Sequence, residues 1–354
     1  MRSLLKPAAG LTCLLALTTA GCSAESDGAS DAAPEASEQT STAPSATPST
    51  SPSTSPSEGA SSATAYAPYV SATDASDLDS TGSPETYNLA FVISDGSGCT
   101  PKWNDNDAIG AAAVKSRIAG LKEDGASVRV SFGGASGDEL AATCDSASEL
   151  ADAYGKALDA AGSTQADFDI EGDELTDSDS VDLRSEAIAL LQQDRADLSV
   201  TFTLPVMPSG LDADSLALLE SANEHDVQVS TVNLMTMNYG ESYDGDMGDY
   251  ALTSAKASHT QLMKVFGLAS AAAWRGMALT SMIGVNDVDG ETFTLSDAAQ
   301  VRTFAAKNEV AWVSMWVTFR DQQCAEGKTG DDDARTNCSG VEQSSGAFAK
   351  AFAG

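Results

Sequence analysis

The run Gln165-Ala166-Asp167-Phe168-Asp169-Ile170-Glu171, followed by Gly172, decides how this chain folds. Successive side chains of a β-strand point to opposite faces, so the three acidic side chains would share one face and the apolar ones the other. Carboxylates packed on one face repel one another, and burial makes each of them harder to ionise. The pattern is typical of a site that holds and moves protons. For these residues alone, an acidic strand end at the surface or a cation site remains the alternative.

From residue 65 onward, short β-rich runs alternate with amphipathic stretches. The predicted strands are Ala67–Val70, Tyr87–Ser94, Ser127–Gly134, Ala166–Glu171, Leu198–Leu204, Thr231–Tyr239, Met277–Ile283 and Val310–Val317. The predicted helices are Ala108–Glu123, Asp138–Ala161, Ser180–Gln193, Ala213–Glu224, Ser254–Ala269 and Ser296–Lys307. The strands are almost continuously apolar, as expected when both faces of a parallel sheet are covered. The alternation predicts an α/β fold, a (β/α)8 TIM barrel over residues 65–354, rather than an open doubly wound sheet.

The position of the acidic run within this pattern favours catalysis. In a barrel of this type the active-site groups lie at the carboxyl ends of the strands. Glu171 falls at that end of its predicted strand, and Asp167 and Asp169 point inward behind it. No Gly-x-Gly-x-x-Gly follows the first predicted strand, which weakens a dinucleotide-binding alternative.

The first 64 residues predict export and a tether. Residues 1–21 have a basic start, a short apolar run and small residues before Cys22, which indicates a lipoprotein-type signal peptide with Cys22 as the lipidated residue; ordinary secretion is the alternative. Residues 22–64 are dominated by Ser, Thr, Ala and Pro and are predicted to be a disordered tether. No later stretch is apolar for long enough to span a membrane. We therefore expect a cell-surface or extracellular bacterial protein that touches the membrane only through its lipid anchor.

Charge and cysteine content exclude several functions. A net charge of -33 argues against binding to nucleic acid or to anionic membrane surfaces. Four cysteines lie outside the signal segment, and an even number in an exported chain predicts two disulfides. Of the three possible connectivities we favour Cys99–Cys144 and Cys324–Cys338. Because no Cys-x-x-Cys pair or His cluster is present, we expect no metal and no cofactor.

With this layout the chain resembles the family 18 glycoside hydrolases, the chitinase family. Ser131-Phe132-Gly133-Gly134 resembles the family's Ser-x-Gly-Gly signature, and Asp167-Phe168-Asp169-Ile170-Glu171 the end of its Asp-x-x-Asp-x-Asp-x-Glu signature. Met235-Thr236-Met237-Asn238-Tyr239 ends the sixth predicted strand, and Trp316 lies on the eighth. The chain departs from the family pattern at Thr164, Met237 and Asn238, where many members have Asp, Tyr and Asp.

The resemblance implies a role for each acidic residue. Glu171 would be the general acid and then the base that activates water, while the 2-acetamido oxygen of the substrate acts as nucleophile. Asp169 would bind the acetamido N–H group, and Asp167 would share a proton with Asp169. The substrate-binding residues implied by the motifs are Trp316, Met237, Asn238, Tyr239, Ser131, Gly133 and Gly134.

The implied function is a monomeric, chitinase-like retaining hydrolase that binds chitin or N-acetylglucosamine oligosaccharides and cleaves β-1,4-linked N-acetylglucosamine polymers. Two alternatives stay open at this point. One is a non-catalytic, lectin-like protein on the same barrel, although such proteins generally lose the acidic residues that this chain retains. The other is a hydrolase of a different glycan that contains the same sugar, such as peptidoglycan or the N-glycan core.

Overall fold

The computed structural model of the chain describes residues 64–327 and 331–354. These residues fall within one compact unit, Gly59–Gly354. The predicted signal peptide and nearly all of the predicted tether lie outside the described residues. In the described part of the chain, no helix is both long and apolar enough to cross a membrane.

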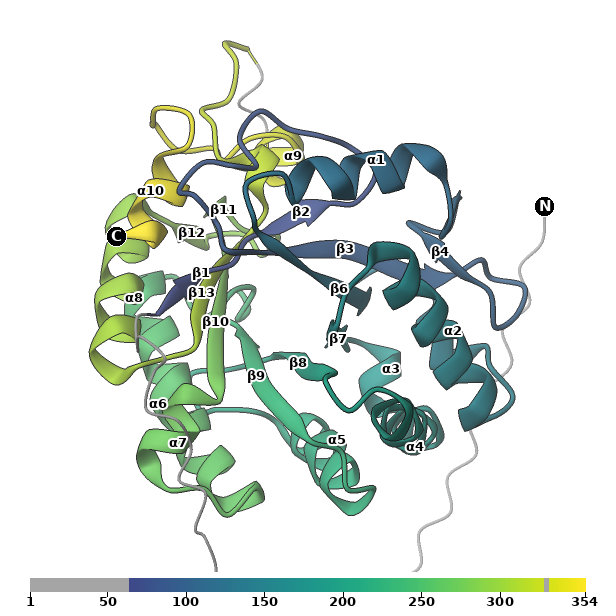
Figure 1. The fold of residues 1–354 in the computed structure, drawn as a ribbon. Helices are drawn as coiled ribbons and strands as arrows, with labels where there is room; N and C mark the ends of the chain where they lie inside the picture. The colour runs from purple at the N-terminus through teal and green to yellow at the C-terminus, as the bar shows by residue number, and fades with distance from the viewer. Residues whose placement is uncertain (1–63, 328–330) are drawn as a thin grey trace, which may run out of the picture. The chain divides into compact units, whose positions relative to one another are not determined.

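A parallel sheet forms the centre of the unit (Figure 1). Its long strands pair side by side in chain order, each parallel to the next: β3 (Thr86–Ser94), β6 (Ser127–Gly133), β7 (Gln165–Asp169), β8 (Ser199–Pro205), β9 (Val229–Met235), β10 (Met277–Met282) and β13 (Trp312–Trp316). At the start of the unit, β1 (Ala65–Tyr66) pairs with β13 and β2 (Tyr69–Ser71) pairs with β3, both in parallel. One extended segment therefore contacts both the first and the last long strand of the series.

Helices connect successive strands and lie on the outside of the sheet (Figure 1). The longer ones are α1 (Ala112–Leu121), α2 (Ala147–Ala161), α4 (Ser178–Asp194), α5 (Ala213–Glu224), α6 (Met247–Val265) and α8 (Leu295–Asn308). The shorter ones are α3 (Asp173–Thr176), α7 (Ser270–Arg275), α9 (Asp331–Thr336) and α10 (Ala347–Ala353), with 3₁₀ turns at Leu140–Ala142 and Thr318–Arg320. This α/β fold with a parallel sheet confirms the predicted fold class.

Short antiparallel strands were not predicted from the sequence. They are β4 (Pro101–Trp103) and β5 (Asp107–Ala108), which extend the sheet beyond β3, and β11 (Gly284–Val285) paired with β12 (Thr292–Phe293). Strands of two or three residues carry too little alternation to be recognised from sequence. They matter for function because β11 and β12 flank a loop that reaches the candidate site.

Local sequence explains where several helices begin. The side chain of Ser146 accepts a hydrogen bond from the backbone of Glu149 at the start of α2, and Asp212 does the same at the start of α5. Thr294 and Asp297 form a capping box at the start of α8. Such caps satisfy backbone N–H groups that the first helical turn leaves without partners.

The outer face of the central strands is aromatic. Phe132, Phe168 and Phe202 occupy matching register positions on β6, β7 and β8. The Phe168 ring centroid lies 5.3 Å from that of Phe132 and 5.7 Å from that of Phe202, and Tyr154 of α2 packs edge-on against Phe168 at 5.0 Å. This packing fixes the alternation of β7, so its acidic residues must face the other way.

Both disulfides have the predicted connectivity. Cys99 is bonded to Cys144, and Cys324 to Cys338. The first joins the loop after β3 to the segment before α2, and the second closes the loop after β13 that precedes the C-terminal helix.

Candidate active site

Three hydroxyl groups surround the first acidic residue of β7. Asp167 is only 1% exposed, and its Oδ2 accepts hydrogen bonds from Ser131 Oγ at 2.6 Å and from Tyr69 Oη at 2.8 Å. Its Oδ1 accepts a hydrogen bond from Thr203 Oγ1 at 2.6 Å. Burial raises the pKa of Asp167 above its usual value, although the hydrogen bonds from Ser131 and Thr203 act to lower it. The donors come from β2, β6 and β8, so three other strands hold this one carboxyl group.

A second tier of polar side chains supports these hydroxyls. Asn233 on β9 donates a hydrogen bond from Nδ2 to Thr203 Oγ1 at 3.0 Å. Thr280 on β10 in turn donates to Asn233 Oδ1 at 2.9 Å. All three residues are 2% exposed or less. The inner face of the sheet therefore carries a connected polar layer where a simple core would be apolar.

Asp169 is buried without equivalent support. It is 5% exposed, and no hydrogen-bond partner for its Oδ1 atom is found among the residues the structure describes. Burial, followed by the charges of Glu171 and Asp167, raises the pKa of Asp169 well above its usual value. The protonated form of this carboxyl group is therefore favoured.

Glu171 lies two residues beyond the end of β7 and is partly exposed. Burial, followed by the negative charge of Asp287, raises the pKa of Glu171 to about 7. A carboxyl group that titrates near neutral pH can both donate and accept a proton under ordinary conditions. Among the acidic residues of the run, Glu171 combines a position on the surface of a cavity with a pKa close to neutral pH.

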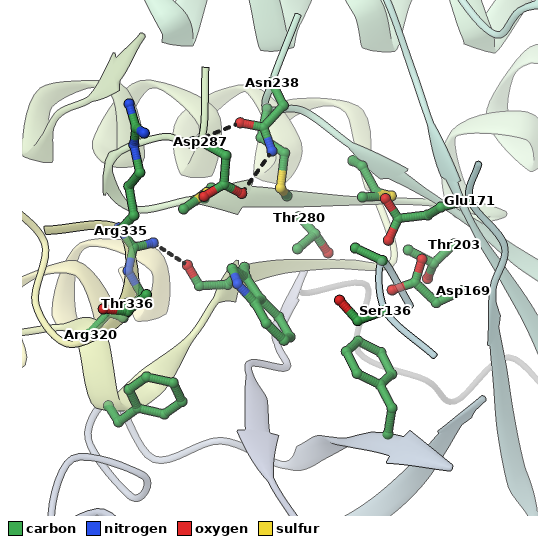
Figure 2. Close-up of a pocket in the computed structure, with 17 residues that line it drawn as sticks. Ser136, Asp169, Glu171, Thr203, Asn238, Thr280, Asp287, Arg320, Arg335 and Thr336 are labelled. Carbon is green, nitrogen blue, oxygen red and sulfur yellow. Dashed lines mark hydrogen bonds between the residues drawn. The ribbon is translucent and has the colours of Figure 1, made fainter. Parts of the chain in front are cut away.

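The cavity has a volume of about 520 Å³ and lies at the carboxyl ends of the strands (Figure 2). Its lining includes the acidic pair Asp169 and Glu171 together with Phe91, Thr203, Met235, Met237, Asn238, Thr280, Met282, Asp287, Trp316, Phe319 and Arg320. A cavity of about 220 Å³ shares Glu171, Met237 and Asn238 with it, and one of about 400 Å³ shares Phe91, Trp316 and Phe319. Glu171 thus lines the boundary between two hollows, as expected for a group that acts on a bond in an extended ligand.

An aromatic surface lines the cavity beside the carboxyl groups. The Trp316 ring, at the end of β13, stacks on Phe91 with centroids 5.5 Å apart and contacts Tyr69 edge-on at 5.8 Å. Trp316 is partly exposed and lines both larger hollows. A ring fixed in this way offers an apolar face to a sugar.

The glycines after β6 support the site without lining the cavity. Gly133 and Gly134 have φ values of +91° and +92°. A Cβ atom on Gly133 would lie 2.2 Å from the Asp169 carbonyl oxygen, and one on Gly134 would lie 2.9 Å from the Phe91 ring. Ser131, Gly133 and Gly134 were expected to bind substrate. The structure places Ser131 against Asp167, while Gly133 allows the close approach of β6 and β7 and Gly134 leaves room for the Phe91 ring of β3.

Tyr239 was expected among the substrate-binding residues, but the structure places its ring in the core. Its ring is buried against Tyr243 and Tyr250, with centroids 5.9 and 5.8 Å away, and it is absent from the residues that line the cavity in the described chain. The expected strand extended to Tyr239, but β9 ends at Met235, and Asn238 has a φ of +54°. The alternation of side chains therefore stops before Tyr239, while Met237 and Asn238 do reach the cavity.

Several residues of the site were not identified from the sequence. Tyr69, Thr203, Asn233 and Thr280 complete the polar layer, and Asp287 lines the cavity. The available signal was a hydroxyl or amide side chain inside a predicted strand, which four of these five residues show. In the described part of the chain, no group of three or more His, Cys, Asp or Glu side chains is arranged to hold a metal ion.

Comparison with known proteins gives relatives of one kind. A probable bifunctional chitinase/lysozyme of Escherichia coli (strain K12) is 34% identical over 275 residues, which cover 72% of this chain and 31% of that protein. Endochitinase 11 of Metarhizium anisopliae is 33% identical over 284 residues, 73% of this chain and 53% of that protein. The chain therefore spans only about a third to a half of the curated relatives it matches. No family model matches the chain.

Solved structures agree with these relatives. Catalytic-site mutants of active domain 2 of a chitinase from Pyrococcus furiosus, complexed with chito-oligosaccharides, superpose with a TM-score of 0.70 at 26% identity. That match covers 83% of this chain and 96% of the solved chain. Family 18 chitinases from Pseudoalteromonas aurantia and Chromobacterium violaceum share the fold at 13% and 14% identity, with TM-scores of 0.52 and 0.54. These relatives and solved structures are all named as chitinases, one of them as a probable bifunctional chitinase/lysozyme.

The contribution of the polar layer can be measured with two substitutions on β8. Thr203→Val removes the hydroxyl that links Asp167 to Asn233, and should lower the free energy of unfolding by about 1–3 kcal/mol, because buried polar partners are left unsatisfied. Thr201→Val is the control, since the Thr201 hydroxyl is buried and has no partner among the described residues. Urea denaturation should show little change for Thr201→Val. Equal losses for both variants would contradict the assigned role of Thr203.

Proposed function

Because its homologues and structural neighbours are chitinases, we propose that this chain is a family 18 glycoside hydrolase that cleaves β-1,4-linked N-acetylglucosamine polymers. The observation that carries the proposal is Glu171, a carboxyl group with a pKa of about 7 at the boundary of two hollows and beside an aromatic surface. It stands at the carboxyl end of a parallel strand, where enzymes of this fold carry out their chemistry.

In the proposed reaction Glu171 first acts as an acid. It donates its proton to the glycosidic oxygen, and the 2-acetamido oxygen of the substrate attacks the anomeric carbon as the bond to the leaving sugar breaks. The product of this step is an oxazolinium ion that keeps the substrate's own amide bonded to the anomeric carbon. Glu171, now ionised, then takes a proton from water as that water opens the ring.

Asp169 and Asp167 assist the attacking amide. Asp169 accepts a hydrogen bond from the acetamido N–H group, and its buried Oδ1 atom, which has no partner among the described residues, supports this assignment. Asp167 shares one proton with Asp169, since two neighbouring buried carboxyl groups do not readily both ionise. Its three hydroxyl donors make Asp167 the better-stabilised anion of the two.

The remaining cavity residues position the sugar. Trp316 supplies the apolar surface for one sugar face, and Met237 and Asn238 line the side of the cavity that continues into the smaller hollow. The two hollows that meet at Glu171 suit an oligosaccharide that is cleaved within its length. A non-catalytic lectin is disfavoured, because binding alone needs neither the buried pair of Asp167 and Asp169 nor a carboxyl group that titrates near neutral pH.

We further propose that the domain acts outside the cell as a monomer, attached through a lipid on Cys22 and the segment that follows it. The signal-like start of the sequence supports this proposal. Cys22→Ser should move the protein from the membrane fraction to the medium of a bacterial host that processes lipoproteins. A protein that stays with the membrane after this change would contradict the lipid anchor.

The assignment of Glu171 is tested with Glu171→Gln, which keeps the shape of the side chain but removes its proton donor. Release of chromophore from aryl chitobiosides and chitotriosides should fall by about 10²- to 10⁴-fold, the usual contribution of general acid–base catalysis. Oligosaccharide binding measured by calorimetry should remain. Absence of turnover by the wild type, with binding retained, would favour the lectin. Turnover of peptidoglycan but not of chitin oligosaccharides would favour the other glycan.

The pH dependence of kcat/KM provides a second test. Glu171 must be protonated to act as the acid, so activity should be present below the raised pKa and should fall as pH increases through about 7. A basic limb near the ordinary pKa of a glutamate, about 4.3, would contradict the raised pKa. The pH profile should be measured with a substrate whose own ionisation lies outside the range.

A further inference from the structure

Asp287 is an acidic residue of the cavity that the proposed mechanism does not use. It lies in the loop between β11 and β12, and it lines the same cavity as Glu171. Figure 2 shows the two carboxyl groups on different sides of that cavity. The Asp287 side chain is exposed, so its charge is available to a bound ligand.

Asn238 holds the Asp287 carboxylate in place. The Asn238 Nδ2 atom donates a hydrogen bond to Asp287 Oδ2 at 3.3 Å, and the Asp287 backbone N–H donates to Asn238 Oδ1 at 3.0 Å (Figure 2). Asn238 has a φ of +54°, a left-handed conformation that Asn and Asp tolerate better than most residues. Two loops 49 residues apart in sequence are thereby joined at the wall of the cavity.

We propose that Asp287, oriented by Asn238, is a substrate-binding residue that accepts hydrogen bonds from the hydroxyl or N–H groups of a sugar in this cavity. A carboxylate offers about four acceptor sites, and the Asn238 amide uses one of them. Sugar hydroxyl groups are donors, and a fixed charged acceptor binds them more strongly than a neutral one. The inference rests on the proposed function and adds a residue to it.

The charge of Asp287 also acts on Glu171. The acidic groups that line the same hollows as Glu171 are Asp169 from β7, Asp287, and Asp212, whose carboxylate caps α5. Two cations also line the cavity. Arg320 donates to the carbonyl oxygens of Val285 and Ala334; burial lowers its pKa to about 10, and the nearby charge of Asp287 acts against that shift. Arg335 pairs with Asp289 and donates to the Asn286 carbonyl oxygen. The negative charge of Asp287 raises the pKa of Glu171 together with burial. One residue thus binds the sugar and helps to keep the acid protonated.

The test uses Asp287→Asn, which removes the charge and keeps the size of the side chain. KM for chitin oligosaccharides should rise about tenfold, the effect of weakening one charged hydrogen bond. The basic limb of kcat/KM should move to lower pH by on the order of half a unit, because a neighbouring negative charge is lost. Asp244→Asn is the control: Asp244 is an exposed carboxylate in the connection after β9 that is absent from the cavity lining.

A swap of the two side chains tests the orienting role of Asn238. Asn238→Asp alone brings two carboxylates together and should raise KM. The double variant Asn238→Asp with Asp287→Asn restores an amide–carboxylate pair, so its KM should be lower than the product of the two single effects predicts. If the KM of the double variant instead equals the product of the two single effects, Asn238 does not orient Asp287.

Failure of this inference can be told apart from failure of the proposed function. An unchanged KM and an unchanged pH profile for Asp287→Asn, with wild-type turnover intact, would overturn the inference alone. If the wild type shows no turnover, the proposed function fails. Calorimetry with chitotriose then still tests Asp287: equal Kd values for the wild type and Asp287→Asn would reject it as a binding residue.

Discussion

The structure depends on how three carboxyl groups on alternate positions of one short segment are accommodated. The outer face of β7 is fixed by Phe168 between two neighbouring phenylalanines, so the acidic side chains cannot turn outward. Asp167 is stabilised by hydroxyl groups from three other strands, whereas the buried Oδ1 of Asp169 has no such partner in the described chain. Because the two carboxyl groups differ in their hydrogen-bond donors, they also differ in how readily they ionise, which is typical of an acid–base site.

The same constraint explains the division of roles along the segment. The two aspartates lie within the sheet, where burial favours protonation. Glu171 lies beyond the strand, at the boundary of two hollows, where partial burial and one nearby charge bring its pKa to about 7. Trp316 and Phe91 add an apolar surface to the same cavity. These positions together suit the acid–base reaction that we propose.

Sequence reasoning located the long strands and the acidic run, because these depend on local alternation or a short motif, and the family resemblance singled out Trp316. The first predicted strand, Ala67–Val70, is replaced by two short strands, β1 and β2. It did not identify Tyr69, whose hydroxyl bonds a carboxyl group 98 residues away, because such contacts depend on sheet register. It placed Tyr239 in the site, although β9 ends four residues earlier and the loop turns that ring into the core. Asp287 was also missed, since only the folded loop brings it to the cavity. The alternation of polar and apolar residues predicts neither the conformation of a loop nor the register between strands.

The most direct test of the mechanism is the configuration of the first product released from a chitin oligosaccharide, followed by proton NMR before mutarotation. Attack by the substrate's own amide, with Glu171 as acid and then base, replaces the leaving group twice, so the mechanism predicts that the β-anomer appears first. Initial release of the α-anomer would show that water attacks directly, and would contradict the role of the buried aspartate pair in assisting the substrate's amide.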